Sequence, residues 1–442
     1  KQLPYGDLSI SSIANHFCNY VDALFQIANL FKDQIDSSSF KNVFYNIETP
    51  LIKVLAEIEN NGIYVNSELL KSLSITVNQK IKKIENKIYS ISGRTFNINS
   101  PKQLSEILFD DLQLKPVKKR STASNVLHVL KNYHPIAEEL LEYRHLNKLV
   151  NTYLDTLPSF VNNDTKRIHT TFNQARVSTG RLSSNKPNFQ NIPIKTDIGK
   201  EIRKAFIPQN DNHFIYSFDY SQIELRILTH FTNETELLKA FNNEEDIHLR
   251  TASLIFDVPE SQVDNSKRQI AKTINYSILY GAGPFRMSKE LGIPMKDAKG
   301  LIETYFKTYP GIQTYIQKTI EDAHMKGFVN TLGGRKRYAQ ALGTSNLNIQ
   351  KAEERALINM PIQGTAAELV KIAMINIHNK IKEHKYKTKM ILQIHDELIF
   401  EVPKYEIESI SELVKFEMEN AVKLSIPLKV DFNWGASWYD AH

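Results

Sequence analysis

Acidic residues occur at two places where a short apolar strand is expected to end. Asp219 follows the apolar run 214–218, and the stretch 390–402 alternates around Asp396 and Glu397, which predicts a hairpin with acids at its tip. A carboxylate at a strand end is poorly placed for a core, and Mg²⁺ typically takes one or two carboxylates together with substrate phosphates. Two such ions can clamp the attacking and leaving oxygens of a phosphoryl displacement. Taken singly, each acid could equally cap a turn or a helix, so that alternative stays open.

A basic and aromatic stripe is expected on a helix over residues 267–281. Arg268, Lys272 and Tyr276 are spaced by four residues, so each step turns only about 40° and all three lie on one face. A guanidinium, an ammonium and an aromatic ring in that order suit a triphosphate with its sugar and base. The alternative is an exposed basic face with the tyrosine in the core.

Length and composition bound the elements that must position these groups. The 442 residues predict about three domains. The single cysteine, Cys18, excludes an intrachain disulfide and a cysteine-based zinc site. A net charge of +6 permits a polyanionic partner without requiring one. No apolar run approaches the ~18 residues of a membrane helix, so no membrane partner is expected. The chain begins at Lys1 without an initiator Met, and we therefore expect a fragment.

Helical periodicity dominates the chain. The apolar spacing predicts helices over 8–31, 51–58, 67–91, 135–157 and most of 234–328. Between them, 168–193 is poor in helix signals, and the basic stretch 115–124 is expected to form an exposed loop. Gly and Pro number only 16 each, which favours long regular elements.

Three segments together resemble the polymerase motifs of family A DNA polymerases. They are Asp219-Tyr220-Ser221-Gln222-Ile223-Glu224-Leu225-Arg226, then Arg268-x3-Lys272-x3-Tyr276-x3-Tyr280-Gly281, then His395-Asp396-Glu397. Further matches are Thr179-Gly180-Arg181-Leu182-Ser183-Ser184, Asn188-x-Gln190-Asn191, Asp246-Ile247-His248 and Gln363-Gly364-Thr365-Ala366-Ala367. The resemblance runs from about Tyr45 to the end of the sequence.

The resemblance implies a helix-rich α+β fold shaped like a right hand, with a palm built on an antiparallel sheet, a thumb and fingers. The implied boundaries are 1–44 for the C-terminal remnant of a 3′–5′ exonuclease-like domain, 45–64 for the start of the palm, 65–155 for the thumb, 156–236 for the palm with the first acidic motif, 237–364 for the fingers with the nucleotide-binding helix 267–281, and 365–442 for the palm with the last motif.

The implied activity is template-directed DNA synthesis, in which a deoxynucleotide is transferred to a primer 3′-OH and pyrophosphate is released. Asp219 and Asp396 would ligate two Mg²⁺ ions, for which Mn²⁺ is a substitute, and the carbonyl of Tyr220 is the expected extra ligand. Glu397 would support these acids. Lys272 would donate a proton to pyrophosphate. The implied partners are primer–template DNA and dNTPs, and the protein is expected to be a monomer.

The incoming nucleotide would meet residues of all the motifs. The expected set is Arg268, Lys272, Tyr276, His248, Glu224, Tyr280 and Gln222. Arg268 and Lys272 would grip the phosphates, with His248 helping at the tail. Glu224 and Tyr280 match the pair that closes the space a ribose 2′-OH would need. Many bacterial members carry Phe where this chain has Tyr276, and Tyr goes with acceptance of dideoxynucleotides.

The duplex would be held by two further sets of residues. Polar side chains that match the primer–template lining reach minor-groove acceptors shared by all correct base pairs. They are Arg181, Asn188, Asn191, Gln363 and His395. Basic residues of the thumb are expected to meet phosphates without regard to sequence. They are Lys148, Lys118, Lys119 and Arg120.

The resemblance weakens before Tyr45. Where an active exonuclease would carry its last Tyr-x3-Asp motif, this chain reads His16-Phe17-Cys18-Asn19-Tyr20, and the paired acidic motifs that would precede it are absent. We therefore predict no proofreading by this fragment. The expected location is the bacterial cytoplasm at the nucleoid, with a DNA-containing organelle as the alternative because targeting segments would be missing.

Three other functions compete with DNA synthesis. A single-subunit RNA polymerase shares the hand and the main motifs, but such enzymes tend to lack a bulky acid at the position of Glu224. A catalytically inactive DNA-binding clamp is disfavoured by the intact acids, and a metal-dependent nuclease by Arg268 and Lys272, which it would not need.

Overall fold

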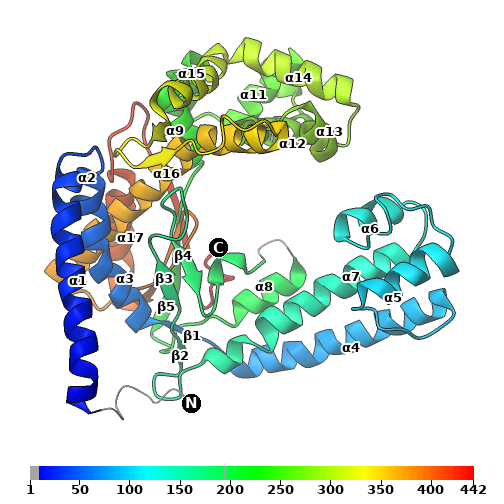
Figure 1. The fold of residues 1–442 in the computed structure, drawn as a ribbon, viewed down its shortest axis with the longest axis horizontal. Helices are drawn as coiled ribbons and strands as arrows, with labels where there is room; N and C mark the ends of the chain where they lie inside the picture. Colours follow the sequence, from blue (N-terminus) through cyan, green and yellow to red (C-terminus); the bar gives the residue numbers. More distant parts are fainter. Residues whose placement is uncertain (1–8, 194–195) are drawn as a thin grey trace.

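The computed structural model describes residues 9–193 and 196–442. An antiparallel sheet of four strands lies at the centre, one group of helices stands above it and another projects to the side (Figure 1). The strand order is β10-β5-β9-β8. The four strands are β5 (His213–Tyr220), β8 (Lys389–Ile394), β9 (Glu397–Pro403) and β10 (Val430–Gly435). The predicted helix-rich α+β class with an antiparallel sheet is confirmed.

Strand alternation places the acids on one face of this sheet. Asp219 is the register partner of Glu397, and Ser217 is the partner of Ile399. Because successive side chains point to opposite faces, all four of these residues share a face. The intervening residues of β5, such as Phe218, point to the other face, where Phe218 contacts Phe400 edge-on. Each face therefore has its own packing partners.

Two buried apolar clusters meet at the sheet. One contains Tyr216, Phe218 and Phe400 together with residues of the helices above. The other contains Ile215 and Ile399 together with residues of the lateral helices. Both groups of helices therefore pack against the sheet, each through its own apolar cluster. This packing determines where each group lies relative to the acids.

The helices above the sheet, called here the upper lobe, span the region predicted to be helical. They are α10 (Thr235–Asn242), α11 (Ile247–Phe256), η7 (Glu260–Gln262), α12 (Asn265–Leu279), α13 (Pro284–Leu291), α14 (Met295–Thr308) and α15 (Pro310–Lys326). The expected helix 267–281 differs at both ends. The Asp264 carboxylate caps it by accepting from the amide of Lys267 at 2.8 Å, and Tyr280 is already its C-cap.

The lateral helices, called here the side lobe, form a second packed unit. They are α4 (Ser67–Ser92), α5 (Pro101–Glu106), η3 (Ile107–Asp111), α6 (Ser124–Leu130), α7 (Ile136–Leu149), η4 (Val150–Leu154) and η5 (Leu157–Phe160). Local signals set the first helices: Asn66 caps α4, Gly93 ends it with φ 74°, and Ser100 caps α5 ahead of Pro101.

The remaining elements surround the sheet and join the two lobes. The helices are α2 (Lys41–Val43), η2 (Phe44–Glu48), α3 (Thr49–Asn61), η6 (Phe189–Asn191), α8 (Asp197–Lys204), α9 (Ile223–Thr232), α16 (Leu347–Glu383), η8 (Lys404–Glu406) and α17 (Ile407–Glu419). Short strands pair as β1 (Ile63–Tyr64) with β2 (Arg167–Ile168), β3 (Thr171–Asn173) with β4 (Ser183–Asn185), and β6 (Phe328–Asn330) with β7 (Lys336–Tyr338).

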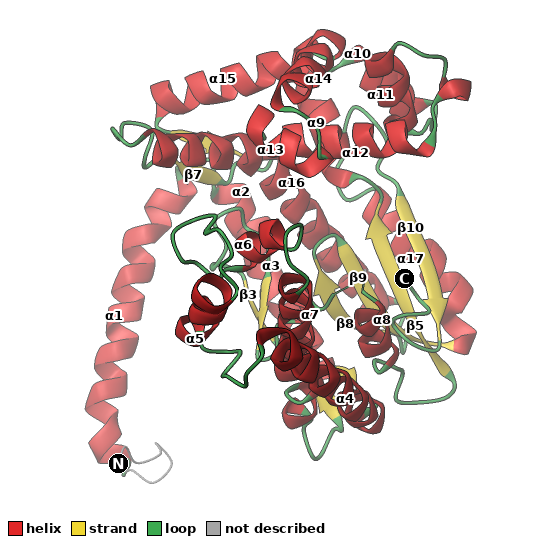
Figure 2. Cartoon of the chain, turned by 90° about the vertical axis from the view of Figure 1, so that its right-hand side faces the viewer, coloured by secondary structure: helices red, strands yellow, loops and turns green. Residues whose placement is uncertain are grey.

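The first helix stands apart from both lobes. Helix α1 (Ile10–Asp36) runs along one side of the molecule (Figure 2). The predicted helix 8–31 overlaps it, but α1 begins at Ile10 and continues to Asp36, and residue 8 lies outside the described residues. Large apolar side chains along α1 are exposed, including Ile10 at 83% and Phe25 at 66%. The assignment of 1–44 to an exonuclease-like remnant stays a prediction. Over the described part of the chain, no helix combines the length and the apolar character that crossing a membrane requires.

Candidate active site

The β5–β9 pairing brings the predicted acids together at one end of the sheet. Asp219 lies directly opposite Glu397, and the carbonyl of Asp396 accepts from the amide of Tyr220 at 3.3 Å. Asp396 lies in the turn between β8 and β9, at the tip of the predicted hairpin, and Glu397 begins β9. The turn is tight enough to force His395 to φ 53°, a left-handed conformation that such connections require.

Burial disfavours the charged form of Asp219 and Asp396, and neighbouring carboxylates add to this effect at Asp219. Burial, then the charges of Glu397 and Asp396, raise the pKa of Asp219 to about 7. Burial also raises the pKa of Asp396. For Glu397, burial raises the pKa, but hydrogen bonds from His442 and Ser217 outweigh it and leave the value lowered. The site therefore carries buried negative charge that a cation would neutralise.

The residues present fit a hard divalent cation shared with a substrate. Within the described ranges, no group of three or more His, Cys, Asp or Glu side chains is arranged to hold a metal alone. Mg²⁺ commonly uses only one or two carboxylates when phosphates complete its shell. Asp219 and Asp396 supply those oxygens. The Tyr220 hydroxyl points away and donates to the Met418 carbonyl at 2.7 Å, which leaves only the Tyr220 carbonyl for a ligand role.

Glu397 is held by neighbours that sequence reasoning missed. Its Oε1 accepts from the Ser217 hydroxyl at 2.6 Å and from the Trp438 indole at 3.1 Å, and His442 Nδ1 lies 3.5 Å away. Ser217 was detectable as the residue two before Asp219 on the same strand face. Trp438 and His442 follow β10 and carry no motif, so only the fold brings them to the site.

The basic stripe of α12 lies beside α11. Arg268 forms an ion pair with Asp246 at 2.7 Å, and Asp246 also caps α11 by accepting from the amides of His248 and Leu249. Lys272 is exposed and has no ion pair with any other described residue. The sequence indicated Arg268 and Lys272 as free phosphate ligands. The structure shows that Arg268 is already oriented by a carboxylate, while Lys272 projects freely.

Tyr276 connects this stripe to the acids. Burial, and then the charges of Glu224, Asp396 and Asp219, raise the pKa of the Tyr276 hydroxyl. The His248 ring lies 5.8 Å from the Tyr276 ring, centroid to centroid. The basic stripe of α12 and the acids at the end of the sheet therefore lie close enough for their charges to act on the same side chain.

Glu224 and Tyr280 form the predicted pair. The Tyr280 hydroxyl donates to Glu224 Oε2 at 2.6 Å, and Arg181 contacts Oε1 at the same distance. Glu224 is only 5% exposed, and burial raises its pKa despite these two hydrogen bonds. Gln222 occupies the N-cap position of α9 in a left-handed conformation with φ 55°, and its side chain makes no capping hydrogen bond. This strained position redirects the chain from β5 into α9 and so aims Glu224 at Tyr280.

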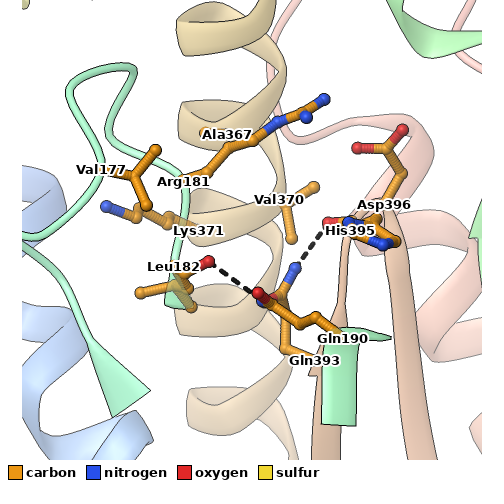
Figure 3. A pocket seen from close by; sticks show the side chains of 10 residues that line it. All are labelled: Val177, Arg181, Leu182, Gln190, Ala367, Val370, Lys371, Gln393, His395 and Asp396. Carbon is orange, nitrogen blue, oxygen red and sulfur yellow. Dashed lines mark hydrogen bonds between the residues drawn. The ribbon is translucent and has the colours of Figure 1, made fainter. Parts of the chain in front are cut away.

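Two of the predicted DNA-contacting residues, Arg181 and His395, line one small pocket beside Asp396. The cavity of about 150 Å³ includes Arg181, Gln190, Gln393, His395 and Asp396 (Figure 3). Gln190 donates to the Leu182 carbonyl at 2.9 Å, and Gln393 donates to the His395 carbonyl. Burial and the nearby Arg181 lower the pKa of His395. The pocket thus presents oriented polar groups next to Asp396.

The other minor-groove candidates differ in how free their side chains are. Asn188 is engaged within its own turn, where its Oδ1 accepts from the Gln190 amide at 2.9 Å and the Ser184 hydroxyl at 3.1 Å. Asn191 is exposed, and Gln363 is partly exposed on α16. Asn188 therefore shapes the loop, while Asn191 and Gln363 keep their polar groups available.

The side lobe carries the predicted phosphate contacts. Lys118, Lys119 and Lys148 are exposed. Arg120 is exposed too, but it grips Asp110 with both terminal nitrogens at 2.8 and 2.5 Å. Lys148 also lines a groove with basic side chains that the sequence analysis did not single out. They are His128, Lys131, Arg144 and His145. Their spacing of three or four residues along α6 and α7 was the available signal.

Acids at one end of a central antiparallel sheet, below a lobe with a basic helix and beside a lobe with exposed lysines, are the arrangement of right-hand nucleotide polymerases. Residues 67–440 match the family model of DNA polymerase family A, and the chain belongs to this family. The resemblance inferred from the motifs is confirmed.

Known relatives align with nearly the whole length of this chain. DNA polymerase I of Bacillus caldotenax is 42% identical over 434 residues, which are 97% of this chain and 50% of that protein. Thermostable DNA polymerase I of Thermus aquaticus is 42% identical over 405 residues, or 90% of this chain and 48% of that protein. The chain thus spans about half the length of these curated relatives.

A solved structure has the same fold. It is the POL domain of Pol1 from M. smegmatis in complex with DNA primer-template and dNTP. The TM-score is 0.90 at 37% sequence identity, and the match covers 95% of this chain and 75% of that one.

Proposed function

We propose that this protein is a DNA-directed DNA polymerase that extends a primer on a template and releases pyrophosphate. The observation that carries the proposal is the shared position of the acids and the nucleotide helix. The charges of Asp219 and Asp396 both raise the pKa of Tyr276, so a triphosphate bound along α12 would end at the acids. The similar solved structure holds DNA primer-template and dNTP, which supports the same partners here.

Asp219, Asp396 and the Tyr220 carbonyl are the proposed ligands of two Mg²⁺ ions, with Mn²⁺ as a substitute. When bound, the ions lower the pKa of the primer 3′-OH and neutralise charge on the triphosphate. Glu397, locked by Ser217 and Trp438, keeps the end of the sheet rigid and adds negative charge beside Asp219.

The phosphates of the nucleotide are assigned to Arg268, Lys272 and His248. Asp246 holds the Arg268 guanidinium in place, so little side-chain entropy is lost when phosphate binds. Lys272, exposed and without a described ion-pair partner, is free to follow the charge that develops on the leaving pyrophosphate and to donate a proton to it.

Sugar selection is assigned to Glu224 and Tyr280. Their hydrogen bond at 2.6 Å closes a wall beside the acids, and a ribose 2′-OH would meet it. The hydrogen bonds from Tyr280 and Arg181 hold the buried Glu224 carboxylate in place, so it cannot move aside to make room for the extra oxygen. The deoxy sugar avoids that clash. Gln222 shapes the turn on which Glu224 is carried.

The lobes are assigned accordingly. The upper lobe corresponds to the fingers, the side lobe to the thumb and the central sheet to the palm, with the boundaries given by the motifs. Exposed Lys118, Lys119 and Lys148 would contact phosphates of the duplex, whereas Arg181 and His395 would contact base edges next to Asp396. We further propose that the protein acts as a monomer, a state that light scattering would test. The curated relatives are bacterial, which supports work at the bacterial nucleoid.

Primer extension tests the activity. A labelled primer on a longer template, with Mg²⁺ and either dNTPs or NTPs, should lengthen only with dNTPs. Asp396→Asn should abolish extension, whereas Asp431→Asn should not, because Asp431 is an exposed carboxylate on the neighbouring strand. Equal extension with NTPs would favour an RNA polymerase, primer shortening a nuclease, and binding without extension an inactive clamp.

We also propose that these 442 residues do not proofread. The α1 segment around Tyr20 lacks the Tyr-x3-Asp motif, the paired acidic motifs that would precede it are absent, and Tyr20 itself is 58% exposed. A primer with a mismatched 3′ end, incubated with Mg²⁺ and no dNTP, should keep its length. Progressive loss of the mismatched nucleotide that persists in Asp396→Asn would contradict this.

A further inference from the structure

A chain of buried polar groups runs behind His248. Asn275 Nδ2 lies 3.1 Å from His248 Nδ1 and 3.2 Å from the hydroxyl of Thr251. The Thr251 hydroxyl in turn lies 2.9 Å from the hydroxyl of Tyr309. Their exposed fractions are 3% for His248, 1% for Asn275 and zero for Thr251 and Tyr309. The chain ties α11, α12 and the start of α15 together.

Donors and acceptors along this chain determine where His248 carries its proton. An amide nitrogen has two protons and accepts none. Asn275 directs one toward Thr251 Oγ1 and the other toward His248 Nδ1. His248 Nδ1 is therefore an acceptor and unprotonated. In a neutral imidazole the single proton then resides on Nε2.

The opposite nitrogen of His248 is left for a ligand. Among the described residues, none forms a hydrogen bond with Nε2. Burial lowers the pKa of His248 to about 4, with Lys272 and Arg268 adding to the effect and Asp246 opposing it. The ring is thus neutral at physiological pH and contributes a directed N–H beside the two cations of the phosphate stripe.

We propose that Asn275 is a positioning residue that holds His248 as the Nε2–H tautomer, so that His248 gives a neutral, directed hydrogen bond to the phosphate tail of the nucleotide. The phosphate half of this inference rests on the proposed function, but the tautomer half does not. A flipped imidazole would offer a lone pair to an anion and repel it. Asn275 therefore acts through His248 and does not touch the nucleotide itself.

The tautomer is measured without any activity. Nitrogen NMR of the histidine-labelled protein, with His248 assigned by its loss in His248→Gln, distinguishes a protonated Nε2 from a protonated Nδ1. The native protein should show Nε2–H. In Asn275→Asp the carboxylate only accepts, so the proton should move to Nδ1. Thr251→Ser keeps the hydroxyl and should retain the native tautomer. A protonated Nδ1 in the native protein would overturn the proposal.

Steady-state kinetics separates positioning from mere packing. Asn275→Asp should raise the dNTP KM about ten-fold, the loss expected for one hydrogen bond to a charged group, with kcat and DNA affinity nearly unchanged. In a His248→Ala background the same substitution should change KM no further, because its effect passes through His248. An equal KM increase in both backgrounds would refute the positioning role.

A second variant covers the case in which Asn275→Asp does not fold. Thr251→Val removes the group that fixes the rotation of the amide, so the Nδ1–H tautomer should become populated and KM should rise. If Thr251→Val keeps the native tautomer and an unchanged KM, the proposed hydrogen-bond chain from Thr251 through Asn275 to His248 is contradicted. If the native protein shows the Nε2–H tautomer and a variant loses it without any change in KM, His248 does not bind the phosphates. The tautomer assignment would then still hold.

Discussion

Replacement of Asp219 by Asn should stabilise the metal-free protein while abolishing polymerisation. The Asp219 carboxyl has its pKa raised from 3.8 to about 7, first by burial and then by the charges of Glu397, Asp396 and Asp431. Because the folded state holds this proton more tightly than the unfolded state, its favourable contribution is complete below about pH 4 and is lost as the pH rises to about 7. An amide keeps the shape without the charge.

The magnitude follows from the shift. Each pKa unit corresponds to about 1.4 kcal/mol, so a rise of about three units corresponds to about 4 kcal/mol above neutral pH. Asp219 is partly accessible to solvent, which screens the repulsion, so the measured gain should be about 2 to 4 kcal/mol. At about pH 5 the pH lies only about one unit above the unfolded pKa, out of a total shift of about three units. The gain in unfolding free energy should then be about a third as large.

Urea unfolding in EDTA, at about pH 5 and about pH 8, provides the measurement. Asp211→Asn is the matched control, since Asp211 is an exposed carboxylate in the turn before β5 and is not among the carboxylates that raise the pKa of Asp219. Mg²⁺ should stabilise the native protein at the higher pH and have little effect on Asp219→Asn. A variant that is no more stable than the native protein at pH 8, or equally more stable at both pH values, would show that the repulsion is not there.

Four further outcomes are expected. Glu224→Ala should raise ribonucleotide incorporation by at least ten-fold, scored on one template with matched dNTP and NTP, and an unchanged ratio would remove Glu224 from sugar selection. Tyr276→Phe should discriminate more strongly against dideoxynucleotides in a chain-termination assay, and equal termination would contradict this. Lys272→Ala should lower the single-turnover rate about 10²-fold and alter its pH profile, and an unchanged profile would rule out proton donation. Lys119→Ala should reduce the slope of log DNA affinity against log salt concentration by about one. Arg120→Ala should reduce this slope less, because Arg120 is already paired with Asp110. Equal reductions would mean that the Arg120–Asp110 pair opens when DNA binds.

Some features of the site depend only on the local sequence, and others depend on contacts between distant segments. The helix carrying Arg268, Lys272 and Tyr276 is predictable, because a four-residue spacing places side chains on one face wherever the helix lies. Its first residue is decided by the carboxylate of Asp264 and its last by the cap at Tyr280. Those ends differ from the predicted ones by two residues.

The acids illustrate what the sequence determined alone. Their type and their position after apolar strands are compatible with a metal-dependent phosphoryl-transfer site, because hard cations need oxygen ligands. The resemblance of the three motifs to family A DNA polymerases, and not the acids singly, turned this into a prediction. The family followed from three motifs in sequence. The helical character of both lobes followed from apolar periodicity and scarce Gly and Pro.

Tertiary structure decided which groups meet and in what charge state. Strand register, set by pairing between residues some 180 positions apart, makes Glu397 and not Asp396 the partner of Asp219. Burial among other carboxylates then raises the pKa of Asp219. The tautomer of His248 likewise depends on Asn275 and Thr251, which reach it from neighbouring turns of two packed helices. Register and burial arise from long-range packing, and so no local pattern in the sequence contains them.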